Sequence, residues 1–313
     1  MHKTARIFVA GHRGLVGSAI VRRLQSLGYD QLLVADRSAL DLTRQSAVES
    51  WFAAQRPQIV ILAAARVGGI LANDSFAAEF LRDNLAIQTN VIDAAYRNGA
   101  QKLVFLGSSC IYPKLAPQPM REEYLLTGPL EPTNEWYAIA KIAGIKMCQA
   151  YRRQYGFDAI SLMPTNLYGP GDNFSLESSH VLPALVRKFH EARLNGAPSV
   201  TVWGTGTPRR EFLHVDDLAD AVAYLAGSYS GAEPINVGVG KDLSIAELAA
   251  LIGQVVGFTG TVHFDTSKPD GTPRKLLDVT RLHALGWQAP TELEAGIRAT
   301  YAWYCAHEGE LRR

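Results

Sequence analysis

The first half of the chain alternates short apolar runs with amphipathic stretches. Helical periodicity predicts helices over about 16–27, 45–55 and 137–155, with further helical sequence between 62 and 102. Strands that are apolar throughout and separated by helices are typical of a parallel sheet covered on both faces. The pattern predicts a Rossmann-type α/β fold with a doubly wound parallel sheet. The predicted strands are Ile7–Ala10, Leu32–Ala35, Ile59–Leu62, Lys102–Leu106 and Ala159–Met163.

After Pro164 the pattern becomes less regular. A turn cluster at 169–173 is followed by predicted helices near 181–194, 244–256 and 291–305, and by a strand at Val200–Trp203. The stretch 211–217 precedes another predicted helix. We expect a Rossmann domain over 1–170 with returning segments near 212–240, and a smaller α/β lobe over 171–313. The active site then lies between them, at the carboxyl ends of the strands.

Composition narrows the class of protein. The 31 basic and 30 acidic residues leave a net charge of +1, which favours neither a nucleic-acid partner nor a membrane surface. Three cysteines are too few for a disulfide framework and indicate a reducing compartment. There is no C-x-x-C or His-x-x-x-His metal motif, no apolar run of about 20 residues, and no room for a signal peptide. We expect a cytoplasmic enzyme without a metal.

A glycine motif follows the first predicted strand. Glycines at this point allow a tight turn and a close approach of a pyrophosphate to the start of a helix, so the motif predicts a dinucleotide site. The spacing departs from the commoner Gly-x-Gly-x-x-Gly, and a glycine-rich connection without a ligand is the alternative. The motif reads Gly11-His12-Arg13-Gly14-Leu15-Val16-Gly17.

Charges near the second predicted strand bear on the cofactor. Asp36 is suited to a ribose 2′-hydroxyl, as in NAD, whereas Arg37 and Arg13 are suited to a 2′-phosphate, as in NADP. The two arginines favour NADP modestly, and Asp36 leaves the question open.

A hydride-transfer set follows the fourth strand. Tyr137 and Lys141 are one helical turn apart and share a face, and Ser108 or Ser109 is placed to bind the same substrate oxygen. The lysine charge, together with a nicotinamide ring, is expected to lower the pKa of Tyr137. The set predicts proton transfer coupled to hydride transfer at a carbonyl.

A thiol beside that set suggests a second reaction. Cys110 lies just past the serine-bearing strand end, and His180 lies just ahead of a predicted helix. A thiolate and a histidine can exchange protons with a carbon next to a carbonyl. The ordinary alternatives are a small buried cysteine and a helix-capping or loop histidine.

These motifs resemble those of a known family. The blocks at 11–17, 106–114, 131–141, 163–170, 202–212 and 268–275 are similar to those of the GDP-L-fucose synthases, the GDP-4-keto-6-deoxy-D-mannose 3,5-epimerase/4-reductases, a branch of the extended short-chain dehydrogenases/reductases. The resemblance covers nearly the whole chain. Ser-Ser-Cys-Ile-Tyr-Pro at 108–113 and the later blocks are specific to this branch, whereas the glycine loop and Tyr-x-x-x-Lys are shared more widely.

The resemblance implies a GDP-sugar substrate, NADP(H) and a homodimer. It implies that Cys110 is the base and His180 the acid of epimerisation, that Tyr137 protonates the reduced keto oxygen, that Lys141 tunes Tyr137 and holds the nicotinamide ribose, and that Ser108 orients the substrate. The implied cofactor residues are 11–17, Arg37, Leu106, Gly107, Ser108, Ser109, Lys141, Pro164, Thr165, Asn166, Leu167 and His180. The implied substrate residues are Lys188, Trp203, Arg210 and Asp270.

Two other functions remain open from the residues. A nucleotide-sugar 4-epimerase or dehydratase that recycles its NAD needs Tyr137 and Lys141 but not Cys110 with His180. A dehydratase usually has an acidic pair near the serine strand end, and 107–114 contains none. The second alternative is a non-catalytic NADP-binding regulator, which the presence of Tyr137 and Lys141 disfavours.

Overall fold

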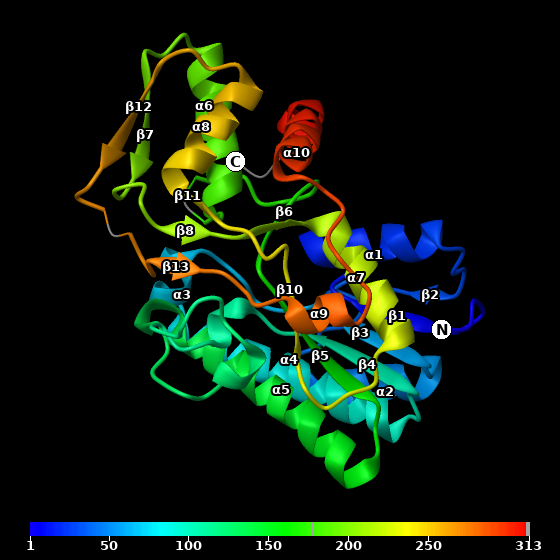
Figure 1. Cartoon of the computed structure of the whole chain (residues 1–313). Coiled ribbons are helices and arrows are strands. Elements are labelled where there is room, and N and C mark those ends of the chain that lie inside the picture. Colours follow the sequence, from blue (N-terminus) through cyan, green and yellow to red (C-terminus); the bar gives the residue numbers. More distant parts are fainter. Residues whose placement is uncertain (177, 269, 311–313) are drawn as a thin grey trace.

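A six-stranded sheet forms the larger part of the molecule in the computed structural model, which describes residues 1–176, 178–268 and 270–310 (Figure 1). All its strands are parallel, in the order β10-β5-β4-β3-β1-β2. This confirms the predicted doubly wound fold. The strands are β1 (Ile7–Ala10), β2 (Leu32–Leu33), β3 (Ile59–Leu62), β4 (Lys102–Leu106), β5 (Ala159–Pro164) and β10 (Ile235–Val237).

Helices cover both faces of this sheet, which is why β1 and β3 are buried at every position. One face carries α2 (Gln45–Gln55), α4 (Ala77–Arg97) and α5 (Glu135–Tyr155), and the other α1 (Leu15–Ser26), α7 (Val215–Ser228) and α9 (Thr280–Ala284). The strand order reverses between β1 and β3, and ligands bind open α/β sheets at such a switch point. The short helix α3 (Ile70–Ser75) follows β3.

The remaining elements form a smaller lobe around a separate apolar cluster. Its helices are α6 (Val181–Leu194), α8 (Ile245–Val256) and α10 (Leu293–His307). Its strands are short: β7 (Ser199–Trp203) pairs with β12 (Thr261–Asp265), and β8 (Arg209–Arg210) lies between β11 (Leu243–Ser244) and β13 (Arg274–Lys275). A further pair, β6 (Asn166–Tyr168) with β9 (Phe212–His214), leads out of the large sheet. One-turn helices lie at Ser109–Ile111, Glu122–Tyr124, Pro132–Asn134 and Glu308–Glu310.

The structure corrects several sequence-based boundaries. β2 ends at Leu33 instead of Ala35, because it is an edge strand with β1 as its neighbour. The predicted helix at 244–256 begins at Ile245, since Ser244 is its N-cap in a capping box with Glu247. The helix predicted after Asp217 begins at Val215. Of the segments near 212–240, β10 joins the large sheet, whereas β9 pairs with β6.

Candidate active site

The glycine turn joins β1 to α1 in a shape that glycine allows. Gly11 has φ +90°, and a Cβ there would lie 2.8 Å from the backbone of Ala64. A Cβ on Gly17 would lie 2.1 Å from the Gly11 carbonyl oxygen. The first turn of α1, described in full, carries neither an acidic residue nor a side-chain cap. Because the first amides of a helix lack intrahelical partners, this turn offers N–H groups to an anion.

Next to this turn, Asp36 is already engaged. Arg13 Nε lies 2.6 Å and His12 Nε2 3.3 Å from Asp36 Oδ1. Arg37 is exposed, and within the described part of the chain it has no hydrogen bond or ion pair, although its charge helps to lower the pKa of Asp41. The Arg37 guanidinium is therefore available to a phosphate, which fits the 2′-phosphate of NADP. Arg13, the other expected phosphate ligand, pairs with Asp36 instead.

Tyr137 and Lys141 stand in the first turns of α5, beside the end of β4. The Lys141 side chain is buried, and its Nζ donates a hydrogen bond of 2.8 Å to the Leu106 carbonyl. The same Nζ lies 5.8 Å from the centre of the Tyr137 ring. Burial lowers the pKa of Lys141 to about 8, and negative charge on Cys110 opposes this shift. The pair shares one helix face, as the spacing predicts.

The expected fall in the Tyr137 pKa includes the effect of a nicotinamide ring, and in the chain by itself this pKa is raised. Burial raises the pKa of Tyr137, and negative charge on Cys110 raises it further. Lys141 does not reverse this, because its ammonium is directed at the Leu106 carbonyl. Tyr137 is therefore a protonated phenol at neutral pH, which is the form that can give a proton to a substrate oxygen.

Cys110 lies in the one-turn helix that follows β4. The Ser108 hydroxyl caps this turn and accepts a hydrogen bond of 3.3 Å from the Cys110 backbone N–H. The Cys110 side chain is half-buried. Burial raises the pKa of its thiol, while a hydrogen bond with Ser108 and the charges of Lys275 and Lys141 lower it. Burial is the larger effect, so the pKa of the thiol lies above its ordinary value and the two lysine charges partly offset this rise.

His180 occupies the N-cap position of α6, but its side chain makes no capping hydrogen bond. The helix-capping interpretation is therefore wrong. The side chain is exposed, yet the protein atoms on its other sides lower its pKa by desolvation, and the charge of Lys275 lowers it further. His180 and Cys110 thus share one charged neighbour, although they come from distant parts of the chain.

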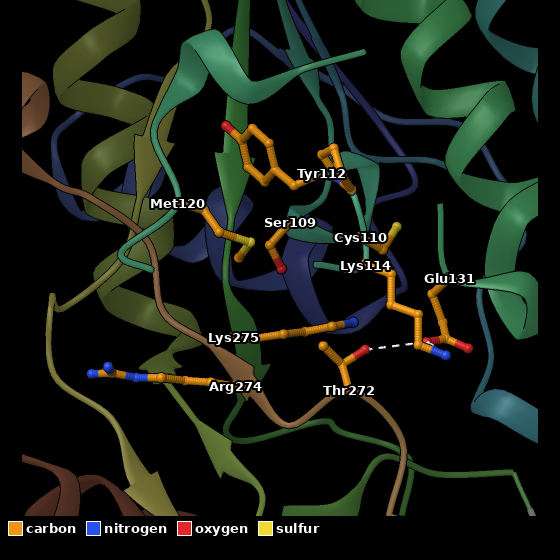
Figure 2. A pocket seen from close by; sticks show the side chains of 10 residues that line it. Ser109, Cys110, Tyr112, Lys114, Met120, Glu131, Thr272, Arg274 and Lys275 are labelled. Carbon is orange, nitrogen blue, oxygen red and sulfur yellow. Dashed lines mark hydrogen bonds and ion pairs between the residues drawn. The ribbon is translucent and has the colours of Figure 1, made fainter. Parts of the chain in front are cut away.

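Cys110 is one of the residues that line a small pocket (Figure 2). Sequence reasoning missed several side chains that line it, above all Lys275 of β13. The sequence block 268–275 contains Lys275, but nothing in its pattern pairs it with Cys110. In the structure, Lys275 stands opposite Arg210 in the β13–β8 pair and lines the same pocket as Cys110. The lining residues are Ser109, Cys110, Tyr112, Pro113, Lys114, Met120, Glu131, Thr272, Arg274 and Lys275.

The segments expected at the nicotinamide end lie on adjacent strand ends. Gly107 N–H donates to the Leu162 carbonyl at 2.8 Å, which places 106–109 beside the end of β5. Pro164 ends β5, and Asn166 and Leu167 begin β6. Thr165 N–H donates to the Val237 carbonyl at 3.1 Å, so β10 supports this turn. The structure thus brings the expected residues 106–109 and 164–167 to one edge of the sheet.

The four expected substrate residues gather in the smaller lobe. Lys188 Nζ lies 5.3 Å from the centre of the Trp203 ring, which is 59% exposed. The Asp270 carboxylate accepts hydrogen bonds from Thr205, two residues after Trp203. Burial lowers the pKa of Arg210, and the charge of Asp270 opposes this shift. An exposed indole with a lysine over its ring offers a flat apolar surface and a cation for a GDP-sugar.

Lys268 was not predicted, and its Nζ lies 5.6 Å from the same Trp203 ring. It belongs to the quoted block 268–275, where only Asp270 was assigned a role. In the described residues, none of the three cysteines forms a disulfide, and no helix is long and apolar enough to cross a membrane. No group of three or more His, Cys, Asp or Glu in those residues could hold a metal ion.

Comparison with known proteins identifies the family of the chain. Residues 7–238 match the NAD dependent epimerase/dehydratase family. The chain belongs to this family. It is 64% identical to the putative GDP-L-fucose synthase 2 of Arabidopsis thaliana, over 97% of this chain and 93% of that protein. It is 56% identical to the GDP-L-fucose synthase of Escherichia coli K12, over 98% of each.

A solved structure agrees. The NADP-bound GDP-L-fucose synthetase of Naegleria fowleri is 31% identical and superposes with a TM-score of 0.93, covering 100% of this chain and 96% of that one. The expected family branch is therefore confirmed, and the chain is a member of the GDP-L-fucose synthase group.

Proposed function

We propose that this enzyme converts GDP-4-keto-6-deoxy-D-mannose to GDP-L-fucose as an NADPH-dependent 3,5-epimerase/4-reductase. The observation that carries the proposal is the closeness of two different acid–base groups. Negative charge on Cys110 raises the pKa of both Tyr137 and Lys141, so the thiol lies near the phenol and the lysine. A nucleotide-sugar 4-epimerase needs the phenol and the lysine but has no use for the thiol.

The thiol side would serve epimerisation. The keto group at carbon 4 makes the protons on carbons 3 and 5 acidic, since the electrons left behind spread onto the carbonyl oxygen. Cys110 as thiolate takes the proton, and His180 supplies one on the opposite face of the sugar ring. The Ser108 hydroxyl holds the oxygen on which charge develops.

The phenol side would serve reduction. NADPH, when bound, supplies the hydride that carbon 4 receives. Tyr137 gives its proton to the carbon 4 oxygen, and its raised pKa keeps that proton in place until it is needed. The Lys141 ammonium then stabilises the phenolate that remains. The hydride and this proton together convert the keto group to a hydroxyl.

The free Arg37 and the glycine turn support NADP(H) as the cofactor. We place the cofactor on the large sheet, over residues 1–170 with segments from 212–240, and the GDP-sugar mainly on 171–313. In this proposal, the residues 106–109, Lys141, 164–167 and His180 surround the nicotinamide end, and Lys188, Trp203, Arg210 and Asp270 hold the GDP-sugar.

We also propose a homodimer, as the resemblance implies. Trp136 and Ile139 support it, since these large apolar side chains of α5 are 42% and 38% exposed and a second copy could cover them. Sedimentation of the wild type and of Ile139→Asp tests this. A dimer that dissociates in the variant supports the proposal, and a monomeric wild type at micromolar concentration rejects it. The cytoplasmic location stays a prediction.

The function is tested by mixing the purified protein with GDP-4-keto-6-deoxy-D-mannose and either NADPH or NADH. We expect nicotinamide oxidation, with GDP-L-fucose as the product by NMR and faster oxidation of NADPH. Oxidation that yields a 6-deoxyhexose with unchanged configuration at carbons 3 and 5 would reduce the function to a 4-reductase. Absence of oxidation with both cofactors would reject the proposal in favour of the NAD-recycling 4-epimerase.

A further inference from the structure

The Lys275 side chain lines the pocket that contains Cys110, and its ammonium has no hydrogen-bond or ion-pair partner in the described residues. Figure 2 shows its side chain extending into the pocket from β13, toward the loop that carries Cys110 and Lys114. Lys114 is paired, with its Nζ 3.0 Å from Glu131 Oε2. Within the described residues, the Lys275 ammonium has neither a hydrogen bond nor an ion pair. Withdrawing an unpaired ammonium from water costs free energy, because the charge loses part of its hydration.

The neighbours of Lys275 come from several elements. Burial lowers the pKa of Lys275, negative charge on Cys110 opposes this shift, Arg210 of β8 adds to it, and Glu131 opposes it. His180, at the start of α6, feels the charge of Lys275 in turn. In the pairing of β13 with β8, Lys275 stands opposite Arg210, and β8 is also paired with β11.

The charged and polar groups near Cys110 differ in whether they already have a hydrogen-bond partner. Ser108 belongs to the same turn, and Tyr137 and Lys141 approach from α5. Lys141 already donates to the Leu106 carbonyl and serves Tyr137. Lys275 has no such commitment. It is therefore the cation best placed to respond to a charge on the sulfur.

We propose that Lys275 is a positioning residue for epimerisation, whose ammonium holds Cys110 in the thiolate form that can act as a base. The role of Lys275 in epimerisation rests on the proposed function. The thiol first loses its proton to water. The thiolate then accepts the proton from sugar carbon, the C–H electrons pass to the carbonyl oxygen, and no oxidant or reductant is consumed. Lys275 thereby links the base on the large sheet to a strand of the smaller lobe.

Alkylation by iodoacetamide in the absence of substrate tests this directly, because the thiolate is the reacting form. The full-length protein is alkylated across a pH series, and the Cys110 and Cys305 peptides are quantified separately by mass spectrometry. In Lys275→Met we expect Cys110 to react about tenfold more slowly at pH 7.5, with its profile displaced to higher pH. Lys275→Arg should restore the wild-type profile. Lys275→Gln repeats the test if the Met variant aggregates.

Arg274→Met is the matched control. Arg274 lines the same pocket, but its Nε pairs with Asp242 Oδ2 at 2.5 Å, so the Cys110 profile should not move. The exposed Cys305 should react equally in every variant. An unmoved Cys110 profile in Lys275→Met overturns the proposal. This includes the case in which only the KM for the GDP-sugar rises, since Lys275 would then bind substrate.

Failure of the proposed function gives a different result. If the Cys110 profile shifts in Lys275→Met while the wild type exchanges no sugar protons with solvent, Lys275 controls the thiolate but the epimerase assignment is wrong. If exchange occurs in the wild type and the profile does not shift, the epimerase stands and the role of Lys275 is rejected.

Discussion

The two halves of the site differ in how they are built. Tyr137 and Lys141 stand on one long helix packed against the large sheet, and a hydrogen bond to Leu106 fixes the lysine. Cys110, His180 and Lys275 come instead from a one-turn helix, the start of α6 and the two-residue strand β13. The phenol side is thus part of the regular scaffold, whereas the thiol side is assembled from irregular segments. Proton chemistry at carbon could therefore be gained or lost without disturbing the sheet.

A buried carboxylate holds the irregular side together. Glu211 is fully buried, and its two oxygens accept backbone hydrogen bonds of 2.6–2.9 Å from Val239, Gly240 and Leu277. Its own carbonyl accepts from Asn166 at 2.8 Å. One residue thereby connects the ends of β10 and β13 to the end of the large sheet. The phenol side needs no such connector, because the sheet ladder supplies the order.

The largest expected effect is that of replacing Tyr137, which should stop reduction while proton exchange continues. Tyr137→Phe removes the proton donor of reduction, so NADPH oxidation should fall about 10³-fold. Exchange of sugar protons with solvent should continue, because it depends on Cys110. Stopped-flow absorbance measures the first and NMR in D₂O the second. A variant that oxidises NADPH at the wild-type rate would remove Tyr137 from the mechanism.

The reciprocal change removes the base. Cys110→Ser replaces a thiol by a hydroxyl that ionises far less readily, so proton exchange at carbons 3 and 5 should fall at least about 10²-fold. NADPH binding, followed by fluorescence, should stay unchanged since the cofactor residues are untouched. Cys305→Ser, at an exposed position, is the control and should match the wild type. Normal exchange in Cys110→Ser would show that another group is the base.

A third change tests the connector. Glu211→Gln turns an acceptor oxygen into an N–H group that faces backbone N–H groups, and should cost about 3 kcal/mol of unfolding free energy. The loss should fall first on the thiol side, seen as faster amide exchange near Gly240 and Leu277. Glu123→Gln, at an exposed residue, is the control. Equal urea midpoints for both variants would show that Glu211 does not hold these segments.

The smallest effect concerns the pH dependence of stability. Burial lowers the pKa of Lys141 to about 8 in the folded chain, below its value of 10.5 when unfolded. The unfolded chain therefore binds more protons between these values, and wild-type stability should rise with pH across that window. Lys141→Met should lack this rise and be more stable at pH 7 by about 2 kcal/mol, because it buries no charge although it loses the bond to Leu106. Parallel stability curves from pH 7 to 10.5 would contradict this.

The same contrast explains what could be predicted from sequence. The central strands and α5 follow from apolar runs and helical spacing, so Tyr137, Lys141 and Cys110 could be placed at one strand end in advance. The strands β8, β11 and β13 are two residues long and carry no periodicity. Lys275 and Glu211 were therefore missed as members of the site. The rise in the Tyr137 pKa in the chain by itself could not be predicted, because burial depends on the packed structure.

The account's central claim is that one pocket carries out two separable proton chemistries. The most direct measurement places the wild type, Tyr137→Phe and Cys110→Ser in D₂O with GDP-4-keto-6-deoxy-D-mannose, follows the signals of H3 and H5 by NMR, and then adds NADPH. The account predicts loss of both signals before NADPH in the wild type and Tyr137→Phe but not in Cys110→Ser, and GDP-L-fucose from the wild type afterwards. Equal exchange in all three proteins, or exchange that Tyr137→Phe abolishes along with reduction, would contradict it.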